Sequence, residues 1–257
     1  MKILRYSQFL IEAKNPCWKG YKQVGTKKKN GKTVPNCVPL GESEEDEESF
    51  SFDELSKEAQ EKAIDKNREI NTEMIDWWDP IIEGYTEELS EIGVDKVDIE
   101  FMISYSQGDG ASFTGIVNDN KKFLRALQID PLESILKKGK IPSEKIKRAL
   151  DEIIENIYIY FYRTDSRYHH ENTVSAEVEV DGDDEIELDL GLGYIVPISV
   201  QDECERLQPL VQDWLRKKCK EIYKSIEKYL DELQSEEAVA EDLRSGGYRF
   251  DKDGNII

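Results

Sequence analysis

Two short segments of this sequence carry the residue types best suited to chemistry. The first is SQGDGAS, residues 106–112, in which Asp109 supplies a carboxylate and the glycines let the backbone approach a ligand closely. The same glycines suit a tight connection between antiparallel strands, so both interpretations stay open. The segment lacks the lysine and the spacing of a phosphate-binding loop. As a binding loop it would use the following residues: Gln107, Gly108, Gly110 and Ser112.

The second segment is RYHHE, residues 167–171, which holds both histidines of the chain, His169 and His170. An imidazole is a common general acid or base, and a catalytic site would need one of them close to Asp109. If the segment is a strand, the two neighbours point to opposite faces and cannot readily bind one metal ion. The alternative is two surface histidines at a strand edge. No motif of a known enzyme class is present, so we expect neither cofactor nor metal and favour a binding protein over an enzyme.

The composition limits the function further. The chain has 257 residues, 38% hydrophobic and 35% charged, which predicts one main domain with tails. Its apolar runs are too short for a membrane span, so we expect no membrane partner. Four cysteines are too few for a disulfide scaffold of this size and fit a reducing cytoplasm. The net charge of −20 opposes nonspecific binding of the whole protein to nucleic acid and favours a basic partner.

The charge is unevenly distributed at the start of the chain. Residues 13–40 contain seven lysines and no acid, whereas residues 42–48 read ESEEDEE. We therefore predict a basic module over residues 13–41, an acidic linker over 42–50 and a folded body over 51–257.

Within the basic module, Asn30-Gly31 is the dipeptide that a two-residue hairpin turn prefers, so a small hairpin is expected. Its lysines are either simply solvated or form a hook for DNA phosphate or an acidic protein surface. The six candidate contacts are Lys19, Lys22, Lys27, Lys28, Lys29 and Lys32. With no histidine nearby, a zinc site in this module is not expected.

The body has the pattern of an α+β fold, with an antiparallel sheet packed by helices and a long C-terminal helix. Alternation predicts a half-buried strand over residues 96–105, and NIYIYFYRT predicts another. The runs TVSAEVEVD and EIELDLGL, joined by DGDD, predict a hairpin. Residues 201–234 carry an apolar stripe at helical spacing, which we interpret as core, with Cys204 and Cys219 as buried thiols. Asp53 is the expected N-cap of an earlier helix, and Ser235 of the last one.

The opening peptide MKILRYSQFLIEA resembles the capsid-targeting sequences of internal head proteins in T-even-type bacteriophages. Those peptides begin with Met-Lys and carry a Phe shortly before a cleavage site of the form Leu/Ile-X-Glu. Here Leu10, Ile11 and Glu12 match that site, and Ala13 would be the new first residue. The resemblance implies that residues 1–12 are a propeptide, with the prohead protease and the capsid core as partners.

The body also resembles a family of phage and plasmid proteins of unassigned function whose members share an SQGDGASF loop and a Tyr-His element. The two resemblances together imply a protein packaged in the capsid interior, with its basic module on the DNA, and later delivered to the host cytoplasm. There we expect it to bind a host or defence protein. The alternatives are an enzyme with its site near Asp109 and His169 or His170, and a prohead core or scaffold component.

Overall fold

The computed structural model describes residues 21–29, 32–39, 49–73, 76–129, 148, 151–189 and 195–257. The predicted propeptide with its cleavage residues, Lys19 and residues 42–48 of the acidic linker lie outside these ranges. The chain divides into two compact units, one made of residues 1–67 with 240–257 and the other of residues 68–239.

The second unit is built on a four-stranded antiparallel sheet whose strands follow one another in sequence order. The strands are β3 (Val94–Met102), β4 (Gly110–Val117), β5 (Ile157–Arg163) and β6 (Val174–Val180). In β5, buried residues alternate with half-buried or exposed tyrosines, as expected for a strand with one face on the core. The strand predicted over residues 96–105 is confirmed, although it begins and ends earlier.

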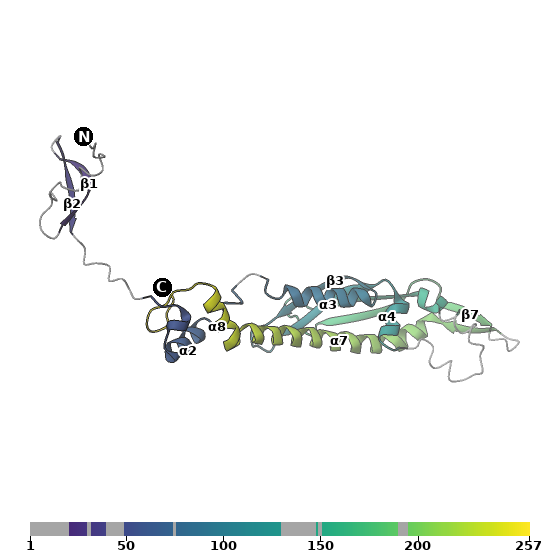
Figure 1. Cartoon of the computed structure of the whole chain (residues 1–257). Coiled ribbons are helices and arrows are strands. Elements are labelled where there is room, and N and C mark those ends of the chain that lie inside the picture. Colours follow the sequence, from purple (N-terminus) through teal and green to yellow (C-terminus); the bar gives the residue numbers. More distant parts are fainter. Residues whose placement is uncertain are drawn as a thin grey trace, which may run out of the picture. The chain divides into compact units, whose positions relative to one another are not determined.

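Three helices of this unit pack on the core face of the sheet: α3 (Asp79–Glu91), α4 (Asn120–Ala126) and α7 (Val200–Leu233). Figure 1 shows α7 running along the sheet. Its apolar stripe is buried from Leu207 to Ile226, so the interpretation of this stripe as core is confirmed. Trp214 packs edge-on against Phe113 and Phe123, which joins α7 to β4 and α4. The α+β class and the long C-terminal helix are thus confirmed.

Two glutamines of α7 cover the outer edge of β6. Gln212 accepts a hydrogen bond from the backbone N–H of Ala176 at 2.8 Å, and its amide donates to the carbonyl of Val174 at 3.2 Å. Gln208 accepts from the N–H of Val178 at 2.8 Å and donates to the carbonyl of Ala176 at 2.5 Å. Residues at i and i+4 lie on one face of a helix, so both side-chain amides reach the same strand edge. There they make the hydrogen bonds that the backbone of a fifth strand would otherwise make with β6.

This edge explains why the predicted hairpin over DGDD is wrong. The run EIELD forms β7 (Glu185–Asp189), but β7 pairs with β8 (Ile195–Ser199) and not with β6. The backbone groups of β6 that would receive β7 are already bonded to Gln208 and Gln212. The alternation of β7 was therefore interpreted correctly, but its partner was not.

The first unit contains a short 3-10 helix, η1 (Phe52–Glu54), followed by α2 (Lys57–Lys66). The prediction that Asp53 is the N-cap of this helix is wrong. Ser56 caps α2, because its hydroxyl accepts a hydrogen bond from the N–H of Ala59 at 3.2 Å. Asp53 instead accepts a hydrogen bond from the Arg244 guanidinium at 2.8 Å. Leu55, which lies between the two helices, is buried.

In the same unit, Phe250 forms isolated antiparallel β-bridges to Phe50 and to Ile256. The last helix, α8 (Glu236–Ser245), begins after Ser235, whose hydroxyl accepts a hydrogen bond from the N–H of Ala238, as predicted for its N-cap.

The basic module contains β1 (Tyr21–Lys29) and β2 (Lys32–Pro39), paired antiparallel with Lys29 opposite Lys32. The expected hairpin is therefore present, with a connection of two residues.

None of the helices in the described ranges has the length and apolar character needed to cross a bilayer.

Candidate functional site

The two segments singled out in the sequence meet at one end of the sheet. Residues 103–109 connect β3 to β4, and residues 164–173 connect β5 to β6. A Cβ atom built on Gly108 would lie 2.8 Å from Cδ1 of Tyr168, and one built on Gly110 would lie 2.4 Å from Cβ of His170. Both values are shorter than any normal contact. At Gly110 the neighbours include backbone atoms of His169 and His170, so glycine is required there for the two loops to pack this closely. We call this part of the molecule the loop end.

The β3–β4 loop is held in shape by Asp109. One carboxylate oxygen accepts from the backbone N–H groups of Ser104 (2.8 Å) and Ser106 (3.0 Å). The other accepts from the hydroxyls of the same serines at 2.7 and 3.0 Å. Asp109 therefore braces its own loop, and the segment forms a tight connection between antiparallel strands, one of its two interpretations. Gly110 and Ser112 belong to β4 and not to the loop, while Gln107 lies exposed within it.

The brace fixes a residue that the sequence analysis did not single out. Tyr105 lies between the two serines in left-handed backbone, with φ of 57°. Its side chain is 84% exposed, the highest value among the large hydrophobic residues described. A left-handed conformation is unusual for a bulky residue and persists only where the surroundings determine it. Here the carboxylate of Asp109 holds the backbone of Tyr105 in this conformation, because it binds the N–H groups of the residues on both sides.

Acid should release this brace. Burial by itself would raise the pKa of Asp109, but hydrogen bonds from Ser104 and Ser106 outweigh it and lower the pKa from 3.8 to about 2. The stabilisation is therefore complete above the ordinary pKa and is lost as the pH falls through about 2. In NMR titrations the amide signals of Ser104 and Ser106 should shift with a midpoint near 2, and Asp109→Asn should abolish the shift. A midpoint near 4 would contradict the brace.

A polar cluster lies beneath the loops, around the fully buried Ser112. Arg163, at the end of β5, donates from Nε to the Ser112 hydroxyl at 3.2 Å. Its guanidinium also donates to the carboxylate of Asp98 at 2.9 Å and to the Asp98 carbonyl at 2.8 Å. Nδ1 of His169 lies 3.1 Å from the Glu100 carboxylate and 3.5 Å from the Ser112 hydroxyl. The cluster joins β3, β4, β5 and the β5–β6 loop.

The cluster does not have the geometry of a nucleophilic triad. In a triad the two imidazole nitrogens are divided between the hydroxyl and the carboxylate. Here Ser112 and Glu100 both approach the same nitrogen, Nδ1 of His169. The Ser112 hydroxyl is also fully buried and already accepts from Arg163, so a substrate carbonyl has no route to it. The arrangement can anchor the two loops on the sheet.

The β5–β6 loop is irregular, which corrects the assumption that its two histidines lie on a strand. The buried hydroxyl of Thr173 lies 2.9 Å from the Tyr168 carbonyl and accepts from the N–H of His170 at 3.1 Å. Nδ1 of His170 accepts from the N–H of Asn172 at 3.1 Å. His169 thus faces the polar cluster, while His170 closes a turn within the loop. Glu171 forms an ion pair with Lys220 of α7 at 3.3 Å.

The cysteines of α7 are unsuited to nucleophilic chemistry. Burial raises the pKa of the Cys204 thiol to about 11 and that of Cys219 to about 12. Both are therefore protonated at neutral pH, and both are buried free thiols, as predicted. Among the described residues, no group of three or more potential ligands is placed to hold a metal ion.

Some of the predicted contacts cannot be assigned a place in the site. The side chains of Lys22, Lys27, Lys28, Lys29 and Lys32 lie outside the described residues, although their backbones form β1 and β2. Conversely, sequence reasoning missed Arg163 and Glu100. A signal for Arg163 was available, because a single cation ends the otherwise apolar and aromatic strand IYIYFYR.

The fold and the loop end define an α+β domain with a four-stranded meander sheet, one helical layer and two interlocked loops. The chain belongs to the family described as Domain of unknown function (DUF8835), whose model matches residues 77–236. The match includes the whole sheet, both loops and α7. Neither a curated protein nor a solved structure matches the chain.

Proposed function

We propose that this protein is a non-enzymatic binding protein whose recognition surface is the loop end. The observation that carries the proposal is Tyr105, a largely exposed aromatic side chain held in left-handed backbone by the Asp109 brace. Rigid tyrosines provide much of the energy of protein interfaces, because they bury a large area and lose little conformational freedom on binding. A loop fixed in this way is organised for binding before its partner arrives.

The neighbouring loop adds contacts of the same kind. Tyr168 is exposed, and the guanidinium of Arg167 lies 5.8 Å from the centre of its ring. Tyrosine and arginine are, with tryptophan, the residue types enriched among strong interface contacts. Small molecules generally bind in enclosed pockets, whereas exposed aromatic residues on adjacent loops suit a protein surface. We therefore infer a protein partner.

Two other functions compete with this proposal. An enzyme would use Asp109 and His169 or His170, but Asp109 is engaged by its own loop and His170 closes a turn. A prohead core or scaffold component would have no role after assembly and would not need a rigid recognition loop. The binding function is therefore favoured.

Affinity capture tests the proposal. Immobilised wild-type protein, Tyr105→Ala/Tyr168→Ala and a control, Ile195→Ala/Leu210→Ala, are exposed to host-cell extract, and captured proteins are quantified by mass spectrometry. The control removes two exposed apolar side chains elsewhere in the same unit. We expect one partner that the wild type and the control retain and that the loop-end variant loses at least tenfold. Equal capture by all three would refute the loop end as the surface.

The enzyme alternative has its own measurement. The wild type is incubated with a mixture of metabolites and nucleotides, and the composition is followed by mass spectrometry. Turnover that Asp109→Ala/His169→Ala/His170→Ala abolishes would replace the binding function with an active site. We expect no change in the mixture.

We further propose that the protein is packaged in a phage head and trimmed after Glu12, with its basic hairpin on the packaged DNA. The Leu10-Ile11-Glu12 tripeptide and the seven lysines of residues 13–40 support this proposal. The negative charge of the rest of the chain would keep the acidic body away from the DNA while the basic hairpin binds it. This location would bring the loop end into the host together with the DNA.

Replacing the cleavage residues should block the trimming. In Leu10→Ala/Glu12→Ala the protease loses both specificity side chains, so virions should contain the full-length chain. Intact-mass measurement and N-terminal sequencing of virion protein give the result. Gln8→Ala, outside the tripeptide, should still begin at Ala13. A double variant that also begins at Ala13 would show that the cleavage assignment is wrong.

A further inference from the structure

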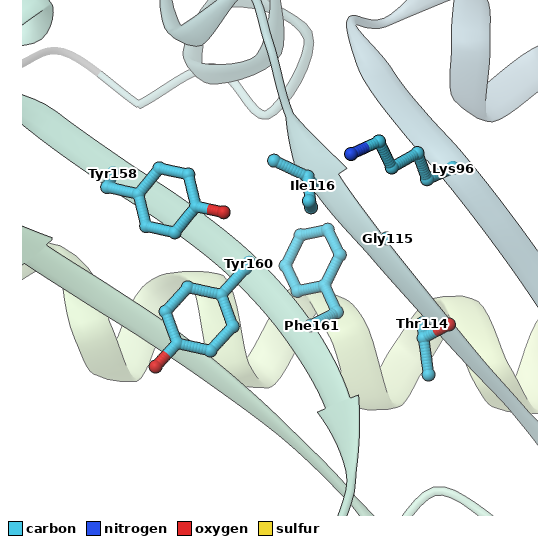
Figure 2. Close-up of a pocket in the computed structure, with 7 residues that line it drawn as sticks. All are labelled: Lys96, Thr114, Gly115, Ile116, Tyr158, Tyr160 and Phe161. Carbon is cyan, nitrogen blue, oxygen red and sulfur yellow. The ribbon is translucent and has the colours of Figure 1, made fainter.

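A second surface lies on the face of the sheet that points away from the core. Tyr158, Tyr160 and Tyr162 occupy alternate positions of β5, opposite in direction to the buried Ile157, Ile159 and Phe161. The centres of neighbouring rings are 5.3 and 5.9 Å apart, with interplanar angles of 37° and 32°. Figure 2 shows Tyr158 and Tyr160 on the near side of the sheet, with a helix passing behind it. We call these three residues the tyrosine row.

A hollow of about 360 Å³ opens beside the row. Tyr158 and Tyr160 line one side of it, and Lys96, Thr114 and Ile116 line the other (Figure 2). This volume is at the lower end of the range for ligand pockets, so it suits one large side chain rather than a cofactor. The hollow lies over β3, β4 and β5 and is separate from the contacts that form the loop end.

Two glutamates of β6 make the other flank of the row negative. The Tyr162 hydroxyl donates to the Glu177 carboxylate at 2.8 Å, and the Tyr160 hydroxyl donates to that of Glu179 at 3.4 Å. The pKa of Tyr160 is raised, first by burial and then by the negative charges of Glu179 and Glu177. The hydroxyls of Tyr160 and Tyr162 are thus turned toward the acids, while each carboxylate keeps lone pairs for a further donor.

Aromatic rings next to carboxylates are suited to cations. An arginine guanidinium stacks on a tyrosine ring and can also donate two parallel hydrogen bonds to a carboxylate. Single-stranded nucleic acid also stacks on aromatic rows, but it needs a positively charged groove for its phosphates. Here Glu177 and Glu179 flank the rings, and the whole chain has a net charge of −20, so phosphate would be repelled.

We propose that the tyrosine row and its two glutamates bind an arginine-rich segment of a partner protein. The guanidinium groups stack on the rings of Tyr158 and Tyr160 and donate to the carboxylates of Glu177 and Glu179. Lys96 lines the opposite wall of the hollow and repels a second cation there, so the arginines lie on the β6 side of the rings. This surface is independent of the loop end, and either site can exist without the other.

The test uses a fluorescent peptide, Gly-Arg-Gly-Arg-Gly-Arg-Gly, with the full-length protein in fluorescence anisotropy. Tyr158→Leu/Tyr160→Leu keeps the net charge, and Glu177→Gln/Glu179→Gln removes two negative charges. The matched control is Glu58→Gln/Glu61→Gln, which removes the same charge from exposed positions of α2. We expect each variant of the row to weaken binding at least tenfold and the control to change it less than twofold.

Two further comparisons separate this site from general attraction to an acidic protein. The peptide with citrulline in place of arginine should not bind, and the lysine peptide should bind several-fold more weakly. In the wild type, ring signals of the tyrosine row should shift on titration with the arginine peptide, a result that needs no variant. Equal weakening by the Glu58/Glu61 control, or displacement of the peptide by a short single-stranded oligonucleotide, would overturn the proposal.

Discussion

Replacing Gln208 and Gln212 together with alanine is expected to lower the free energy of unfolding by about 2–5 kcal/mol. The change removes partners from two backbone N–H groups and two carbonyls of β6. An unsatisfied buried polar group costs about 1–3 kcal/mol, and water entering at the edge offsets part of that cost. Urea unfolding followed by circular dichroism gives the change in stability.

The same variant should also associate more strongly than the wild type at equal concentration, because an uncovered strand edge can pair with another chain. Gln201→Ala is the matched control, since this glutamine of the same helix is exposed and its amide donates to Glu205 of the same helix, at 3.2 Å. The control should stay within about 0.5 kcal/mol of the wild type. A double variant as stable as this control would show that the glutamines do not protect the edge.

Gly110→Ala is expected to separate the two loops of the loop end. The added Cβ would lie 2.4 Å from Cβ and 2.7 Å from Cα of His170, so backbone has to move. Overpacking of this kind costs about 1–3 kcal/mol. Displacing the β5–β6 loop should also move His169 away from Ser112 and Glu100, which NMR would detect as large shifts of the His169 ring signals.

Gly84→Ala is the matched control, because the added Cβ would have no atom within 4 Å and the residue lies inside α3. Alanine has the higher helix propensity, so this variant should be more stable by up to about 1 kcal/mol. If Gly110→Ala left the His169 signals and the stability unchanged, the interlocking of the two loops would be refuted.

Much of the fold follows from periodicity that is visible in the sequence. The alternation of β5 and the stripe of α7 predict a strand and a core helix, because each pattern reports directly which face is buried. The pairing of β6 did not follow, because its edge is covered by side chains of residues about thirty positions later in the chain. No local turn signal carries that information.

The candidate site could be predicted only in part, for the same reason. Glycines and histidines drew attention to the two loops, but their meeting depends on contacts between distant residues, such as Ser112 with His169 and Arg163 with Asp98. The role of Asp109 was also open, since a carboxylate between glycines suits a brace as well as a base. Only the positions of Ser104 and Ser106 decide between them.

The place of α7 at the end of its unit sets the order of events during synthesis. All four strands of the sheet leave the ribosome before Leu207 to Ile226, the residues that cover their apolar face. Until α7 has been synthesised, the apolar face of the strands therefore stays uncovered. Exposed apolar surface of this kind makes a nascent chain prone to aggregation and to binding by chaperones. Folding of this unit is completed only after translation has passed Leu233, so a nonsense mutation before Val200 would leave a sheet without its covering layer.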